Sequence, residues 1–169
     1  MKTEIYKLSA TELSKAYENK TLSPVEATYS VLERIKNIDE KLNAYVFIDE
    51  DLAISQAKKS EIRWNKGNQK SNIDGVPTAI KDLLLTKGWP TLRGSKTVNK
   101  NLEWKDDAPV TARLKESGAV LIGKTTTPEF GHKGTTQSPL TGITRNPWNI
   151  ELTSGGSSGG SSSSVSSGM

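Results

Sequence analysis

Apolar residues recur at helical spacing in the first third of the chain, and capping signals mark the helix starts. The stretch Ser9-Ala10-Thr11-Glu12 has the spacing of a capping box and predicts a helix to about Asn19. Ser23-Pro24-Val25-Glu26 repeats the signal with proline at the first helical position. The second helix is expected to reach about Asp39, because apolar residues keep helical spacing at Val31, Leu32, Ile35 and Ile38.

The pattern then changes to a short extended segment and back to a helix. Residues Asn43 to Ile48 end in four apolar side chains and predict a strand. A third helix is expected from Glu50 to Trp64, with Gly67 as its stop. Its core-facing side is expected to hold Leu52, Ile54, Ala57 and Ile62. We expect these helices to pack and scaffold rather than to react.

Two apolar strands and one helix are predicted in the middle of the chain. After a polar loop over 67–74, residues Gly75 to Asp82 predict a short strand with Lys81 at its end. Ala108 to Ser117 predicts a helix that Gly118 closes, with Val110, Ala112 and Leu114 buried. Ala119 to Gly123 is a continuous apolar run, typical of a buried strand. A helix followed by such a strand indicates an α/β fold with some parallel pairing.

Composition narrows the class of protein. The 169 residues suit one domain, and 33% apolar and 25% charged residues make it polar without indicating disorder. The net charge of +4 is spread over interleaved acids and bases, so a dedicated nucleic-acid surface is not indicated. Residues 1–14 lack the apolar centre of a signal peptide, and no apolar run has membrane-spanning length. We therefore expect a soluble, cytoplasmic protein.

Two residue counts restrict the possible chemistry. The chain has no cysteine, which excludes disulfides, thiolate catalysis and cysteine-based metal sites. Its single histidine, His132, rules out a histidine-cluster metal site and would have to serve any Ser-His-Asp triad. We expect no metal, and lysine becomes the main alternative base for a serine. One lysine among many is usually an exposed charge. Lys81 is followed by Asp82 but lies within an otherwise apolar stretch of Ala79, Ile80, Leu83, Leu84 and Leu85.

The stretch 154–168 consists almost entirely of glycine and serine, a composition typical of a flexible linker. Its glycines come as two pairs, however, Gly155-Gly156 and Gly159-Gly160, on either side of Ser157-Ser158. Glycine pairs let backbone N–H groups turn toward one point, and a following small-residue helix can pack close to a sheet. Such a loop can bind a phosphate or an oxyanion. A P-loop needs lysine where this sequence has Ser161, so the serines are the more promising chemistry.

Six stretches of the chain strongly resemble the amidase signature family, in the family's order. They cover residues 75–169 almost continuously, whereas the N-terminal helices are compatible with the family without being diagnostic. The six stretches are Gly75–Asp82, Asp107–Val110, Gly118–Thr125, Thr127–Gly131, Asn146–Asn149 and Gly155–Ser161. We interpret residues 1–169 as a partial amidase signature domain, with an N-terminal helical region (1–67) followed by the Lys-bearing strand through the Gly/Ser loop (68–169).

The resemblance implies the N-terminal part of an α/β/α fold around a mixed sheet, incomplete in this chain, and chemistry at carboxamide C–N bonds. It implies a Lys–Ser–Ser triad without a cofactor, in which Lys81 is the lysine and Ser157 the bridging serine, after a cis Gly156–Ser157 bond. The substrate loop would comprise Gly155, Gly156, Ser158, Gly159, Gly160 and Gly131.

The family's nucleophile is a serine in a later stretch, Gly-Thr-Asp-x-Gly-Gly-Ser-x-Arg, and these 169 residues contain no such stretch. The family also prefers alanine where this chain has Ser162 to Ser164, Ser166 and Ser167. We therefore interpret the chain as the N-terminal portion of an amidase, shortened by truncation, frameshift or a deliberate cut, and inactive by itself.

Three functions remain open at this point. The first is an amidase, or its remnant, acting on a small carboxamide. The second is the glutaminase subunit of a tRNA-dependent amidotransferase, in which case tRNA would be a partner. The third is a non-catalytic module that binds an amide or carboxylate ligand.

Overall fold

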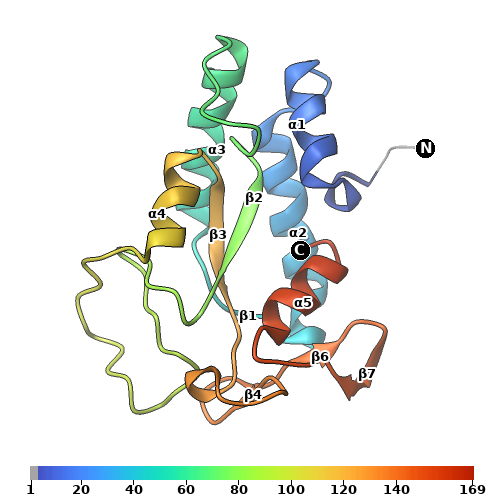
Figure 1. Ribbon diagram of the computed structural model, residues 1–169. Coiled ribbons are helices and arrows are strands. Elements are labelled where there is room, and N and C mark those ends of the chain that lie inside the picture. The colour runs from blue at the N-terminus through green and yellow to red at the C-terminus, as the bar shows by residue number, and fades with distance from the viewer. Residues whose placement is uncertain (1–3) are drawn as a thin grey trace.

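The computed structural model describes residues 4–169. The first three residues of the predicted 1–67 region, which also begin the segment searched for a signal peptide, lie outside the described residues. The centre of the fold is a three-stranded mixed sheet in the order β1 (Tyr45–Ile48), β3 (Val120–Thr125), β2 (Pro77–Lys81). Strand β3 pairs antiparallel with β1 and parallel with β2, so the predicted α/β class with a mixed sheet is confirmed (Figure 1).

Within residues 4–169, five α-helices accompany this sheet: α1 (Ala10–Glu18), α2 (Pro24–Leu42), α3 (Glu50–Asn65), α4 (Pro109–Glu116) and α5 (Gly159–Ser166). A 3-10 turn, η1 (Ile5–Lys7), precedes them. Helix α2 packs Val31, Leu32 and Ile35 against Tyr45 and Ile122 of the sheet. A separate cluster joins Ile80, Leu121 and Trp89, with Leu114 of α4 against it.

The starts of the first two helices form as their sequences predict. Ser9 and Ser23 each accept a hydrogen bond from the backbone N–H of the glutamate three residues on, and both capping boxes are complete. Helix α2 continues past the predicted end at Asp39 to Leu42 and stops where Asn43 turns left-handed at φ 54°. Val31, Leu32 and Ile35 are buried as expected, whereas the fourth expected core residue, Ile38, is only partly buried.

The buried side of α3 differs from the predicted one. Leu52 and Ile62 are exposed, at 37% and 53%, whereas Ala53, Ala57 and Ser60 are buried. Ala53 and Ala57 contact Val120 of β3, and this close helix-to-strand approach favours small side chains over Leu and Ile. The prediction was thus right for Ala57 and wrong for Leu52 and Ile62, while Ile54 packs partly buried at the edge of the α2 cluster.

The buried side of α4 also differs from the predicted one. Val110 is 46% exposed, and Ala112 and Leu114 are only partly buried. The fully buried residue of this helix is Thr111. Because α4 is only eight residues long, a rotation of one position is enough to exchange an apolar for a polar core residue.

The segment after β3 contains several short regular elements. Strand β3 itself runs to Thr125 and takes Lys124 into the interior. A 3-10 turn follows, η2 (Glu129–Gly131), and then two small antiparallel pairs. The pairs are β4 (Gln137–Ser138) with β5 (Gly142–Ile143), and β6 (Arg145–Asn146) with β7 (Asn149–Thr153).

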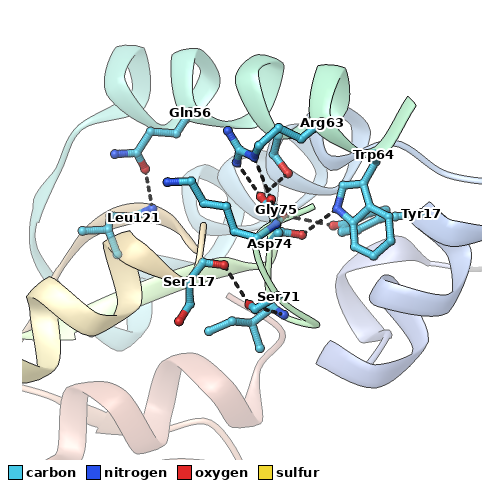
Figure 2. A network of polar contacts seen from close by, with 12 residues as sticks. Tyr17, Gln56, Arg63, Trp64, Ser71, Asp74, Gly75, Ser117 and Leu121 are labelled. Carbon is cyan, nitrogen blue, oxygen red and sulfur yellow. Dashed lines mark hydrogen bonds and ion pairs between the residues drawn. The ribbon is translucent and has the colours of Figure 1, made fainter. Parts of the chain in front are cut away.

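A buried carboxylate ties α3 to the loop that leads into β2 (Figure 2). The Asp74 side chain is fully buried and accepts hydrogen bonds from Ser60 Oγ (2.7 Å), Arg63 Nε (2.7 Å) and the backbone N–H of Lys70 (2.8 Å). Burial alone would raise the pKa of Asp74, but these hydrogen bonds outweigh it and leave the pKa below its ordinary value. This network anchors the 67–75 loop to α3.

Within residues 4–169, no helix is long and apolar enough to cross a membrane.

Candidate active site

Lys81 is the last residue of β2, and its side chain reaches the glycine/serine loop. Its Nζ lies 2.7 Å from Ser157 Oγ and 2.9 Å from Ser158 Oγ. The structure thus brings together the two residues that the resemblance implied, and Lys81 is partly buried. Desolvation lowers the pKa of Lys81 below its ordinary value. A lysine in this position can exchange a proton with either of two serine hydroxyls.

The loop around Ser157 has the backbone geometry that the resemblance implied. The Gly156–Ser157 peptide bond is cis, and Gly155 has a φ of 76°. Helix α5 begins within the second glycine pair, at Gly159. A Cβ atom on Gly160 would lie 2.4 Å from the backbone nitrogen of Thr126, so only glycine lets α5 approach β3 this closely. This close approach places Ser157 beside the end of β2.

Threonines that the sequence did not single out hold this loop. Thr136 Oγ1 donates to Gly155 O (2.9 Å) and accepts from the Gly159 N–H (3.0 Å), so one hydroxyl bridges both glycine pairs. Thr127 Oγ1 donates to Ser157 O at 3.2 Å. Both threonines are almost completely buried. Their positions in a stretch rich in Thr, Gly and Pro carry no local signal, because their partners lie 19 to 30 residues away.

One residue of the predicted substrate loop, Gly131, lies outside the glycine/serine stretch. Gly131, at φ 70°, lies against the Leu83 side chain and belongs to the same turn that Thr127 connects to Ser157. Most serines of α5 instead use their hydroxyls within or beside the helix. Ser161 pairs with Thr125, Ser163 donates to Arg145 O, and the donors to helix carbonyls are Ser164, Ser166 and Ser167. His132 is exposed and makes no hydrogen bond to a serine of residues 4–169.

Comparison with protein-family models matches residues 26–169 to the family described as Amidase. The chain belongs to the amidase family. Its curated relatives include a glutamyl-tRNA(Gln) amidotransferase subunit of Thermobifida fusca, 41% identical over 165 residues, which covers 96% of this chain and 32% of that protein. The corresponding subunit of Geotalea daltonii is 40% identical, with 96% and 33% covered. The chain therefore spans about a third of the length of these relatives.

Solved amidase structures share the fold. A bacterial aryl acylamidase of the amidase signature family superposes with a TM-score of 0.87 at 33% identity, covering 92% of this chain and 32% of the other. A protein from a vestigial complex, described in connection with the origins of an s-triazine catabolic enzyme, reaches a TM-score of 0.91 at 30% identity and covers 95% and 35%. The fold of this amidase family chain thus corresponds to about a third of each.

Proposed function

We propose that Lys81 and Ser157 are the general base and the proton relay of a site that cleaves the C–N bond of a carboxamide. The observation that carries the proposal is the 2.7 Å separation of Lys81 Nζ and Ser157 Oγ at the end of β2. Membership in the amidase family supports the reaction class. The proposed substrate is a small carboxamide.

The 2.7 Å distance supports the first step of the proposed proton path. In its neutral form Lys81 accepts the Ser157 proton, while Ser157 Oγ accepts the proton of the nucleophilic hydroxyl. That hydroxyl oxygen attacks the amide carbon, the C–N bond breaks as the amine takes up the proton, and an acyl-enzyme remains. Water then hydrolyses the acyl-enzyme, or another amine receives the acyl group. The lowered pKa of Lys81 increases the fraction that is neutral and able to act as a base.

We further propose that the nucleophile is not one of the α5 serines. Ser163 and Ser164 are buried, and both donate their hydroxyls to backbone carbonyls. The Ser161 hydroxyl is hydrogen-bonded to the Thr125 hydroxyl. The family's nucleophile motif is absent from these 169 residues, so the proposed third member of the triad lies outside them.

A second candidate is the corresponding subunit of a glutamyl-tRNA(Gln) amidotransferase. It is favoured by the names of relatives at 38–41% identity, compared with 33% or less for the structural neighbours named above. The same Lys81–Ser157 pair would then release ammonia from an amide donor, and a tRNA-bearing complex would be the partner.

A chimera tests both candidates. Residues 1–169 are joined to the remaining two thirds of the T. fusca relative, and hydrolysis of glutamine and of aryl amides is measured. Lys81→Met and Ser157→Ala should each lower kcat by about 10²–10⁴-fold, with a smaller change in KM, because neither residue mainly binds the ground state. The control is Lys58→Met, an exposed lysine of α3. Glutamine as the preferred substrate favours the amidotransferase, and near-full turnover by Lys81→Met contradicts the assigned role.

A further inference from the structure

A buried ion pair lies directly next to the candidate base and has no part in the proton path. Lys124 is fully buried, the Asp82 side chain is 2% exposed, and Lys124 Nζ lies 3.9 Å from Asp82 Oδ1. Lys124 Nζ donates to Leu84 O (2.7 Å) and to Thr91 Oγ1 (2.8 Å). Taking two charges out of water is unfavourable unless further hydrogen bonds compensate, so a pair at this position calls for an explanation.

Lys124 points away from Ser157. Neighbours across paired strands project to the same face of a sheet, and successive residues project to opposite faces. Ile80 pairs with Lys124, whereas Lys81 pairs with Thr125. Lys81 therefore faces α5 and the glycine/serine loop, and Lys124 faces the side of Trp89 and Leu84. Any effect of Lys124 on the site must pass through other residues.

Asp82 begins a series of contacts that leads back to Ser157. Its carboxylate accepts hydrogen bonds from the backbone N–H groups of Leu92 (3.1 Å) and Gly94 (3.3 Å). Together with the Thr91 contact to Lys124, these bonds fix the reversal over residues 91–95, in which Arg93 and Gly94 both have positive φ, at 57° and 64°. The ion pair thus holds a loop that has little regular structure of its own.

The 91–95 loop in turn holds the turn next to Ser157. Phe130 N–H donates to Arg93 O (2.8 Å), and Ser95 Oγ donates to Glu129 Oε1 (2.7 Å). A Cβ atom on Gly94 would lie 2.6 Å from Thr127 O, so the two backbones are in direct contact. Thr127 Oγ1 then donates to Ser157 O at 3.2 Å. The path from Asp82 to Ser157 is therefore continuous.

We propose that the Asp82–Lys124 ion pair is a positioning element, which holds Ser157 against Lys81 through the 91–95 loop and the 127–131 turn. It rests on the roles proposed for Lys81 and Ser157. The pair acts from the far face of the sheet and touches neither of the reacting groups. Removal of the two side chains loosens the loop and the turn, and Lys81 then becomes more accessible to water. Deprotonation of Lys124 alone does not have this effect, because the neutral amine still donates to Leu84 O and Thr91 Oγ1.

The protein offers a matched control. Arg63 and Asp74 form another buried pair, with Asp74 fully buried, in the network of Figure 2. Their partners there lie in α3 and in the 67–75 loop, without contact to the 91–95 loop. A charge-balanced double substitution of either pair removes two charges of opposite sign. The two substitutions differ in whether the connection to Ser157 is broken.

The test follows the titration of Lys81 by NMR on the 169-residue chain labelled at the lysine side chains, with Lys81→Met used to assign its signal. Desolvation is the cause of the lowered pKa of Lys81, so its titration reports access to water. In Asp82→Asn/Lys124→Met the pKa of Lys81 should rise toward that of ordinary lysine, which lowers the neutral fraction of Lys81 at neutral pH. Arg63→Met/Asp74→Asn should leave it unchanged.

Thr91→Val keeps both charges and removes the hydrogen bond from Lys124 together with the long one from Thr91 Oγ1 to Leu84 O (3.5 Å), so it provides the measurement if the double variant does not fold. It should shift the Lys81 titration in the same direction and speed amide hydrogen exchange at Gly94 and Phe130 by about tenfold or more. An unchanged titration in Thr91→Val and in the folded double variant, or an equal shift in the Arg63→Met/Asp74→Asn control, overturns the proposal. Because no amide is present, inactivity of the chimera would refute the proposed function without affecting this result.

Discussion

Raising the pH from about 7 to about 9.5 should stabilise the folded chain, because the buried Lys124 ammonium can then lose its proton. Burial lowers the pKa of Lys124 from 10.5 to about 8, and Asp82 offsets only part of this effect. Above pH 8 the folded state therefore releases a proton that the unfolded chain keeps up to about 10.5. Since the unfolded state binds more protons in this window, stability rises with pH.

The size of the effect follows from the two pKa values of Lys124. A difference of about 2.5 pKa units corresponds to about 3 kcal/mol over the whole window. About 2 kcal/mol of this falls between pH 7 and pH 9.5. Tyr17 and Tyr45 set the upper limit of the experiment, because burial raises both of their pKa values and their ionisation destabilises the folded state above about pH 10.

The assay is urea denaturation at a series of pH values, followed by circular dichroism. The reference is Asp82→Asn/Lys124→Met, which also removes the carboxylate that would otherwise stay buried alone. Both proteins carry Lys81→Met, since the lowered pKa of Lys81 would add a slope of the same sign. The free energy of unfolding should rise by about 2 kcal/mol with pH in the first protein and stay flat in the reference. Equal slopes in the two would refute a neutralisable, buried Lys124.

Three further predictions concern the chain alone. The purified 169-residue chain should hydrolyse no amide from a broad panel; turnover that Lys81→Met and Ser157→Ala abolish would show that one of its own hydroxyls is the nucleophile. Asp74→Ala should lower the free energy of unfolding by about 3–5 kcal/mol, because Arg63 and Ser60 lose their partner, whereas the exposed Asp106→Ala should change it by less than about 0.5 kcal/mol. Gly160→Ala should cost about 1–3 kcal/mol, because its Cβ would meet backbone atoms of Thr126; a cost no larger than that of Gly134→Ala, where the space is open, would contradict the close packing of α5.

Features whose causes lie within a few residues could be predicted from the sequence alone. Both capping boxes join groups three positions apart, and the apolar run at the start of β3 needs only its own composition to indicate a buried strand. The six ordered stretches identified the family, and with it Lys81 and Ser157 as candidates. The pairing of a lysine and a serine 76 residues apart came from this resemblance, because no local pattern contains it.

Which side of each element is buried, and which polar groups meet inside, depended on the packing of the whole chain. Leu52 and Ile62 are exposed although helical periodicity favoured them, because α3 lies too close to β3 for large side chains. From the sequence alone, a lysine such as Lys124 is expected at the surface. It is buried in the structure, where Leu84 O, Thr91 Oγ1 and Asp82 Oδ1 lie around its Nζ. Thr127 and Thr136 likewise hold the glycine/serine loop through hydrogen bonds to residues distant in the sequence. The energy of a buried polar group depends on partners distant in the sequence, and only the folded chain brings those partners together.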